Sequence, residues 1–275
     1  MHEIETGLSQ VRHIIAIASG KGGVGKSTTT VNLALAMAAQ GAQVGILDAD
    51  IYGPSLGLMV GIAEGSRPKI KHERFMPLSA HGIQVMSMAF LVDAKTPMVW
   101  RGPMASSALQ QMLNQTHWPS LDYLFVDMPP GTGDIQLTLC QRTRISGAVI
   151  VTTPQDLALL DARKGIEMFG KVNVPILGVV ENMAAHICSQ CGHAEPVFGA
   201  GGGDRLAQQY QIAMLASIPL SMVIRQQVDG GKPTVVAEPY GVIARAYGRL
   251  ADSVAQQLAT STDSQDIPEI SIDDD

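Results

Sequence analysis

Apolar runs bounded by glycine or proline alternate along the chain with stretches in which apolar residues recur at helical spacing. A short apolar run favours a buried strand, whereas a repeat every three or four residues favours a helix with one face in the core. The pattern predicts strands at residues 13–18, 43–47, 83–88, 123–126, 148–151 and 176–180. It predicts helices at residues 26–40, 104–115, 156–171 and 239–259.

This alternation predicts an α/β protein whose central sheet is mostly parallel and carries helices on both faces, in three layers. Ligands of such sheets collect at the carboxyl ends of the strands. Asp48 follows the second predicted strand, Asp127 follows the fourth, and a glycine-rich segment follows the first. The sequence therefore predicts one ligand site, at that edge of the sheet.

The glycine-rich segment matches the phosphate-binding pattern G-x-x-x-x-G-K-[ST] between a predicted strand and a predicted helix. Its glycines let several backbone N–H groups point inward, and the helix N-terminus adds its positive dipole end. We expect Lys26 to contact the β- and γ-phosphates of ATP, Ser27 to ligate Mg²⁺ and Thr28 to reach the α-phosphate. The expected nucleotide-binding residues of the loop are Gly20, Lys21, Gly22, Gly23, Val24, Gly25, Lys26, Ser27 and Thr28.

Carboxylates at strand ends beside such a loop commonly hold Mg²⁺, directly or through water. Asp127, in the stretch VDMPPGTGD, fits this role, which is that of the Walker B aspartate, and we expect it to hold Mg²⁺ through water. Asp48 and Asp50 follow the second strand, and Asp48, the nearer of the two to the strand, competes for a role at the metal. The glycines and prolines after Asp127 suggest a loop that approaches the γ-phosphate and moves once it leaves.

Composition supports a protein with a large core and gives no sign of a membrane segment. Hydrophobic residues make up 46% of the 275 residues, while aromatic residues make up only 4%, which suits parallel strands covered by helices. No apolar run reaches the roughly 20 residues of a membrane helix, and the N-terminus lacks the apolar core of a signal peptide, so we expect a cytoplasmic protein.

The net charge of −6 comes from the C-terminal end. The six acidic residues there leave the rest of the chain formally neutral, so we expect neither nucleic acid nor membrane as a partner. We predict three segments: a short extension at residues 1–12, an ATPase domain at 13–259, and an acidic, disordered tail at 260–275. The six acidic residues are Asp263, Asp266, Glu269, Asp273, Asp274 and Asp275.

The three cysteines form a close pair, Cys188 and Cys191, and one isolated residue, Cys140. An odd count without a signal peptide favours reduced thiols over a disulfide framework. Two thiols three residues apart can hold one metal ion or one edge of a cluster, but a tetrahedral zinc site or a [4Fe–4S] cluster commonly needs four ligands. The spacing leaves open a cluster shared by two copies, a zinc site completed by His186 or His193, and a redox dithiol.

The second lysine of the loop, Lys21 in GKGGVGKST, resembles the deviant Walker A motif of the MinD, ParA and nitrogenase-iron-protein group. The resemblance implies a homodimer in which Lys21 reaches the partner's phosphates, joining Lys26 and Asp50 as catalytic residues, with Asp50 orienting the attacking water. It also implies that Asn182 reads the adenine, and we expect Pro219 and residues 225–229 on the other side of the base.

The stretch from about residue 14 to 259 resembles the Mrp/ApbC family of iron–sulfur cluster carrier ATPases. The resemblance implies ATP hydrolysis and a [4Fe–4S] cluster held between two subunits by Cys188 and Cys191, for delivery to apo iron–sulfur proteins. The matching stretches are GKGGVGKST, LDADIYGPS, WRGPM, DMPPGTGDIQLTL, TTPQDLALLDARKG, ENM followed by CSQCGH, and IPL with IRQQVDGGKP.

Three features depart from the family pattern. Ser189 and Gln190 stand where many members have a proline between the cysteines, Ser221 follows IPL where an acidic or other polar residue is common, and only about a dozen residues precede the first strand. Many bacterial members carry a small domain there, so docking of partners through it is in doubt.

The main alternative is a ParA/MinD-type dimerisation switch without a cluster, although the acidic C-terminus does not provide that group's basic amphipathic helix. A tyrosine autokinase would have a tyrosine-rich tail, which this chain lacks. An electron-transfer reductase would have its cluster cysteines farther apart in sequence.

Overall fold

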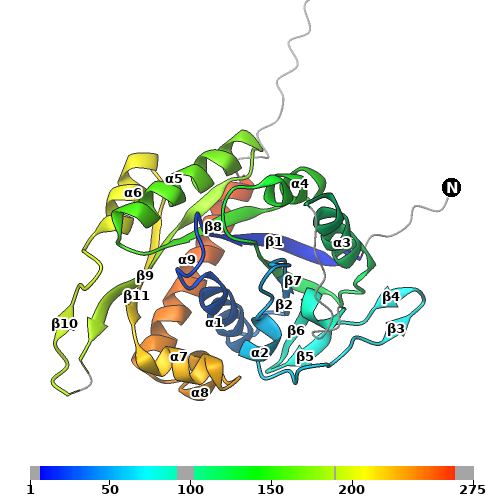
Figure 1. The fold of residues 1–275 in the computed structure, drawn as a ribbon, viewed down its shortest axis with the longest axis horizontal. Coiled ribbons are helices and arrows are strands. Elements are labelled where there is room, and N and C mark those ends of the chain that lie inside the picture. Colours follow the sequence, from blue (N-terminus) through cyan, green and yellow to red (C-terminus); the bar gives the residue numbers. More distant parts are fainter. Residues whose placement is uncertain (1–6, 92–101, 189, 264–275) are drawn as a thin grey trace, which may run out of the picture.

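The computed structural model describes residues 7–91, 102–188 and 190–263, and its centre is a mostly parallel sheet (Figure 1). The strand order is β10-β9-β8-β1-β7-β2-β6-β5, with β11 also paired to β9. Only β5 and β10, at the two ends of this order, run antiparallel to their neighbours. The strands of this sheet are β1 (Val11–Ala18), β2 (Val44–Asp48), β5 (Leu78–Ala80), β6 (Ile83–Ser87), β7 (Leu121–Asp127), β8 (Gly147–Thr152), β9 (Ile176–Ile187), β10 (Ala194–Glu195) and β11 (Met214–Leu220).

Helices cover both faces of the sheet, and β3 (Ile70–Lys71) and β4 (Arg74–Phe75) form a separate hairpin. Figure 1 shows α3 to α6 on one side of the sheet and α1, α2 and α7 to α9 on the other. The helices are α1 (Lys26–Ala39), α2 (Leu56–Met59), α3 (Gly102–Gln115), α4 (Asp134–Arg142), α5 (Asp156–Lys171), α6 (Gly202–Tyr210), α7 (Met222–Asp229), α8 (Thr234–Ala237) and α9 (Val242–Asp263). The predicted three-layer α/β fold is confirmed.

The core lies between the sheet and its two helical layers. Every residue of β2 and of β8 is buried, as expected for parallel strands covered on both faces. Phe125 on β7 and Phe169 on α5 are fully buried aromatic residues of this core. None of the helices in the described part of the chain is long and apolar enough to cross a membrane.

The ten elements predicted from periodicity are all present; the helix at 156–171 has the predicted ends, and the other nine are shifted at one end or both. Three corrections concern their extent. The helix α9 continues to Asp263, so residues 260–263 are helical and do not belong to the predicted tail. The first strand begins at Val11, inside the predicted N-terminal extension. The strand predicted at 176–180 continues as β9 to Ile187, so the cysteine pair lies at the turn that follows this strand.

Some motif residues lie outside the described residues. These are Trp100 and Arg101 of WRGPM, Ser189 between the two cysteines, and the acidic segment 264–275.

Replacing the ring of Phe125 with a methyl group tests the central place of β7 in the core. Because this side chain is 0% exposed, Phe125→Ala should lower the free energy of unfolding by about 3–5 kcal/mol in urea titrations. The matched variant Tyr240→Ala removes a ring that is 88% exposed and should change it by less than about 0.5 kcal/mol. Equal losses for the two variants would contradict this description of the core.

Candidate functional site

The carboxyl ends of β1, β2 and β7 meet at one edge of the sheet. In the parallel register Ile17 pairs with Asp127, and Asp48 pairs with the same residue from the other side. The Ala49 N–H donates to the Asp127 carbonyl at 2.9 Å, which ties the end of β2 to that of β7. The glycine-rich loop after β1 therefore lies beside both carboxylates, at the edge where the sequence predicts a ligand.

Glycines shape the loop Gly20–Ser27 in two ways. Gly23 and Gly25 have φ angles of 81° and 82°, in the left-handed region where a side chain is strained. A Cβ on Gly20 would lie 2.1 Å from the Asp161 carbonyl carbon of α5, so the loop packs directly on that helix. At Gly22 and Gly23, by contrast, a Cβ would meet no atom within 4 Å. A phosphate can therefore approach the backbone of this part of the loop closely.

The Asp127 carboxylate joins β7 to the first turns of α1. Its Oδ2 accepts from Lys26 Nζ at 2.6 Å and from Ser27 Oγ at 2.6 Å, while its Oδ1 accepts from Thr30 Oγ1 at 2.6 Å. Lys26 is 6% exposed and Asp127 is fully buried, so this ion pair is shielded from water. The sequence interpretation missed Thr30, although its position four residues after Lys26 puts both on one face of α1.

The Asp48 carboxylate holds the segment between β2 and α2. Its Oδ1 accepts from the Asp50 N–H at 3.2 Å, and its Oδ2 accepts from the N–H groups of Ser55 and Leu56 at 3.0 and 3.1 Å. The hydroxyl of Ser87, at the end of β6, also donates to Oδ2 at 3.1 Å. Because these four donors occupy the carboxylate, Asp48 serves to position the segment that carries Asp50.

Burial is the largest effect on the acidity of Asp48, which is 1% exposed, and the nearby charge of Asp127 acts in the same direction. The N–H groups of Leu56 and Asp50 and the ammonium of Lys26 oppose these two effects but do not cancel them. Together they raise the pKa of Asp48 to about 7.

Asp50 and Lys21 lie at the rim of the site. The Asp50 side chain is half-buried, and its Oδ1 accepts from the Gly53 N–H at 3.3 Å. Lys21 is half-buried, and its ammonium makes no ion pair with any residue in the described part of the chain. Gly131, with a φ of 97°, donates its N–H to the Ser19 carbonyl at 3.0 Å and so brings the loop after Asp127 to the same place.

Asn182 on β9 contacts the loop directly. Its Nδ2 donates to the Val24 carbonyl at 2.9 Å, and a Cβ on Gly25 would lie 2.1 Å from that nitrogen. Pro219 on β11 lies at an irregularity in the register, between the pairs Ile218–Asn182 and Leu220–His186. The next residue after Asn182, Met183, has a φ of 57°, which marks a local distortion of β9 that periodicity does not reveal.

Farther along, the predicted base-contacting residues 225–229 form the second half of α7, where Arg225 and Asp229 make an exposed ion pair at 3.2 Å.

The cysteine pair lies at the turn between β9 and β10, away from the phosphate loop. Cys188 N–H donates to the His193 carbonyl at 2.9 Å, and Gly192 N–H donates to the Cys188 carbonyl at 2.8 Å. The N–H groups of Cys191 and then Gln190, followed by the Cys191 thiol, lower the pKa of Cys188 by hydrogen bonding to its sulfur. The turn is thus shaped to stabilise a thiolate at Cys188.

Neither the third cysteine nor the histidines add a metal ligand to the cysteine turn in the part of the chain that the structure describes. Burial raises the pKa of Cys140, on α4, to about 11, which disfavours its thiolate. Among the residues that the structure describes, no three His, Cys, Asp or Glu side chains gather closely enough to hold a metal ion. Within a single chain, the cysteine turn therefore presents two sulfur ligands.

A buried glutamate anchors the chain beyond the cysteine turn. Glu181 is 5% exposed, and its Oε2 accepts from the Gly203 N–H at 2.6 Å, at the start of α6. The segment that holds the cysteines is thereby fixed to β9 at both ends. The sequence interpretation missed this contact because it joins residues on either side of a long loop.

The fold and this site define the protein as a P-loop NTPase. The chain belongs to the family of NUBPL iron-transfer P-loop NTPases, whose ParA-type model matches residues 10–255. The resemblance to iron–sulfur cluster carrier ATPases stated from the motifs is confirmed at the level of the family.

Among its relatives is the iron-sulfur cluster carrier protein of Pseudomonas fragi, 68% identical over 246 residues that cover 89% of this chain and 86% of the relative. The iron-sulfur cluster carrier protein of Escherichia coli K12 is 58% identical over 255 residues, covering 92% of this chain and 69% of that protein. A similar solved structure is the nucleotide-binding protein of Archaeoglobus fulgidus in complex with ADP. It has a TM-score of 0.76 and 36% identity, and the match covers 90% of this chain and 98% of that one.

The raised pKa of Asp48 predicts a pH-dependent stability. The folded protein holds the Asp48 proton more tightly than the unfolded chain, so this carboxyl contributes a loss of stability as pH rises from 3.8 to about 7. Asp48→Asn should remove this contribution, on the order of a few kcal/mol, from the free energy of unfolding measured between pH 5 and 8. The readout is the slope of the free energy of unfolding against pH. The absolute value is not compared, because the asparagine side chain faces N–H donors and therefore lowers stability at every pH.

The exposed Asp204 provides a matched control, since Asp204→Asn should keep the slope of the parent protein. An Asp48→Asn variant with an unchanged slope would contradict the raised pKa.

Proposed function

We propose that this protein binds and slowly hydrolyses ATP with Mg²⁺, and that it works as a homodimer. In this proposal the dimer carries a [4Fe–4S] cluster on Cys188 and Cys191 and delivers it to apo iron–sulfur proteins. The observation that carries the proposal is the cysteine turn, which offers two thiol ligands and, in the described part of the chain, no third. The names of the relatives as cluster carriers support the same cargo.

The contacts of the phosphate loop support the assignment of roles at the nucleotide. The N–H groups of residues 20–28 receive the phosphates, and Lys26 turns from Asp127 to the β- and γ-phosphates. Ser27 and Asp127 would hold Mg²⁺, the Ser27 hydroxyl directly and the Asp127 carboxylate through water. The ion, when bound, neutralises charge on the phosphates and positions them for in-line attack. Asp50 orients the attacking water, and Asn182 and Pro219 flank the base.

A second copy supplies what one chain lacks. Lys21 has no carboxylate partner among the described residues, so its ammonium can contact the phosphates of a facing copy, where negative charge develops during transfer. Leu157 and Leu160 of α5 are 72% and 49% exposed, on the helix against which Gly20 packs. Exposed apolar side chains beside a reactive loop favour a protein interface there.

The same two-fold arrangement completes the cysteine site. A tetrahedral set of four thiolates requires two copies of a turn that offers two, and a two-fold axis provides them. Thiolates are soft ligands that suit iron–sulfur clusters and zinc alike. The absence of a third ligand in the described part of the chain counts against zinc held within one chain, and the family favours the cluster.

The state of the cysteines bears on the cellular setting. We propose a cytoplasmic protein, because its three cysteines are unpaired and a cluster carrier needs reduced thiols.

Two lysine variants separate nucleotide binding from hydrolysis. Lys26→Ala should abolish measurable MgATP binding in calorimetry, because in this proposal Lys26 is the lysine that contacts the β- and γ-phosphates of its own chain's nucleotide, whereas Lys21 contacts those of the facing copy. Lys21→Ala should bind MgATP nearly as well but lower turnover about a hundredfold, since it removes one transition-state cation. Lys171→Ala, an exposed site on α5, should match the parent in both assays. Unchanged turnover for Lys21→Ala would rule out its role in trans.

Cysteine variants test the cargo. Protein reconstituted with iron and sulfide without oxygen should hold about four iron per dimer and absorb broadly in the visible range. Cys188→Ser and Cys191→Ser should each lose the iron and sulfide while keeping MgATP binding, whereas Cys140→Ala should retain both. Zinc without iron under the same conditions, or iron retained by both serine variants, would defeat the cluster assignment while leaving the ATPase assignment intact.

A further inference from the structure

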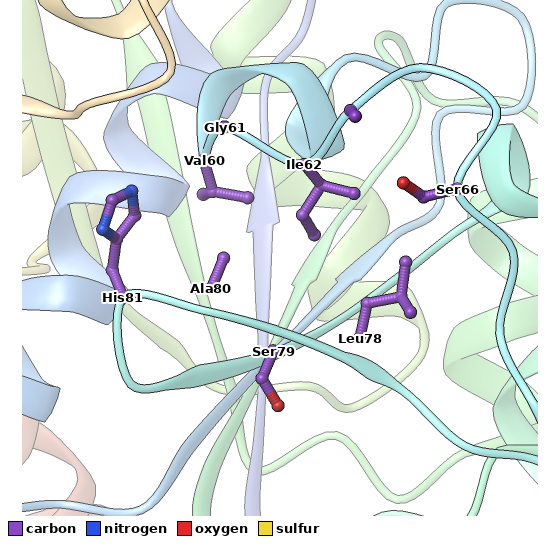
Figure 2. A pocket seen from close by; sticks show the side chains of 9 residues that line it. Val60, Gly61, Ile62, Ser66, Leu78, Ser79, Ala80 and His81 are labelled. Carbon is purple, nitrogen blue, oxygen red and sulfur yellow. The ribbon is translucent and has the colours of Figure 1, made fainter.

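A shallow cavity of about 440 Å³ opens beside the last strand of the sheet, at the end opposite the cysteine turn. One wall is the segment that follows α2, and the other is β5 with the turn after it. Figure 2 shows aliphatic side chains lining its middle, with a histidine and a serine at its two ends. The side chains that matter here are Val60, Ile62, Ser66, Leu78, Ala80 and His81. We call residues 60–66 and 78–81 the β5 groove.

β5 has one unused edge. It pairs with β6 on one side, and on the other side it meets no strand in the part of the chain that the structure describes. Ser79, at its centre, is exposed. The free N–H and C=O groups of such an edge are a template on which another extended segment can add.

Positive charge is concentrated next to the groove. Residues 67–74 carry four of the chain's 19 lysines and arginines, and the acidic residues of this stretch and of the adjoining groove are Glu73 and Glu64. Arg67, Lys69 and Lys71 are exposed, and none makes an ion pair with a residue that the structure describes. At the other end of the groove, His81 Nε2 lies 3.1 Å from the Gly231 carbonyl, and the next residue, Lys232, is exposed.

The hairpin of β3 and β4 carries the basic residues from Lys69 to Arg74, and we call it the basic hairpin. Backbone hydrogen bonds hold it at its base. The Met76 N–H donates to the Lys69 carbonyl at 2.8 Å, and the His117 N–H donates to the Phe75 carbonyl at 2.8 Å. Its turn is tight, because His72 and Glu73 both have positive φ angles, of 49° and 62°. Lys69 and Lys71 therefore lie on a hydrogen-bonded hairpin next to the groove.

We propose that the β5 groove docks an extended, acidic segment of a partner protein, which adds to β5 as a further strand. Side chains of a strand alternate in direction, so an aliphatic residue can enter the cavity while its neighbours point outward. Carboxylates on that segment meet Arg67, Lys69 and Lys71, which have no carboxylate of their own among the described residues. This inference depends on neither nucleotide nor cluster.

The composition of the surface favours a peptide over a nucleic acid. Residues 60–81 contain no tryptophan or tyrosine, their one phenylalanine, Phe75, is half-buried at the base of the hairpin, and the ring of His81 lies against the Gly231 carbonyl, so the groove offers little on which bases could stack. Its cavity is lined with aliphatic side chains, which suit an aliphatic guest.

The test uses the whole protein and a fluorescein-labelled nonapeptide in which glutamate alternates with valine, followed by fluorescence anisotropy. The peptide should bind, and binding should weaken as salt screens the charges. Peptides with glutamine for glutamate, or serine for valine, should bind at least about tenfold more weakly.

Two kinds of variant locate the bound peptide. The double variant Lys69→Glu, Lys71→Glu should weaken binding about tenfold or more by reversing the local charge. Ala63→Trp, at the exposed rim of the cavity, should weaken it similarly by filling the cavity. The matched double variant Arg163→Glu with Lys171→Glu makes the same change in net charge on α5, on the other side of the sheet. It should bind the peptide as the parent does. Circular dichroism checks that each variant is folded.

Three outcomes would overturn the proposal. These are no binding of the acidic peptide, equal binding of the glutamine peptide, and unchanged binding by folded Ala63→Trp. A single-stranded oligonucleotide serves as the alternative ligand. If it binds more tightly than the peptide, and if its binding is lost in the Lys69→Glu, Lys71→Glu variant but in no other variant, the basic hairpin is a nucleic-acid surface instead.

Discussion

The buried carboxylate of Asp127 fixes the geometry of the nucleotide site, because three groups from the start of α1 converge on it. A charge at this depth is strongly destabilising when it loses its partner. Lys26, Ser27 and Thr30 therefore hold α1 against the end of β7 at a distance set by hydrogen bonds. Since the loop Gly20–Ser27 ends in α1, the position of its backbone N–H groups follows from the same contacts.

The Asp127 contacts also tie the proposed binding of metal to the proposed movement of Lys26. The ammonium can leave Asp127 for a phosphate only if another cation neutralises the carboxylate, because an unpaired buried charge costs several kcal/mol. Mg²⁺ held by Ser27 and Asp127 would meet that requirement. Nucleotide and metal are thus expected to bind as a unit, and Asp48, with its raised pKa beside Asp127, will respond to the same change in local charge.

Local pattern was sufficient to predict some parts of this structure and not others. The loop Gly20–Ser27 is recognisable because its glycines, lysine and serine are adjacent in sequence and lie between a strand and a helix with clear periodicities. Asp127 was expected beside the loop because parallel strands end at one edge. Its contact with Thr30 was missed, since a threonine inside a helix carries no motif signal of its own.

Other features depend on contacts between distant segments. The role of Asp48 in holding residues 50–56 requires Ser87, which comes from another strand. The extension of β9 to Ile187 depends on pairing with β10 and β11, which come from later in the chain. The end of α9 was placed too early because its last residues are polar. There, Thr260 and Ser261 satisfy their hydroxyls by donating to carbonyls four residues earlier in the helix, which lets these residues remain helical.

The strand β9 gives the proposed ATPase and cluster sites a common support. Asn182 touches the phosphate loop at Val24, Glu181 anchors α6, and the same strand ends at the cysteine turn. The phosphate loop and the base of the cysteine turn are therefore joined by one continuous strand, in which Met183 has a left-handed φ of 57°. The β5 groove lies at the opposite end of the sheet from β10. A partner segment on β5 can thus stay bound while a second copy faces the phosphate loop and the cysteines, so docking and dimerisation need not compete for one surface.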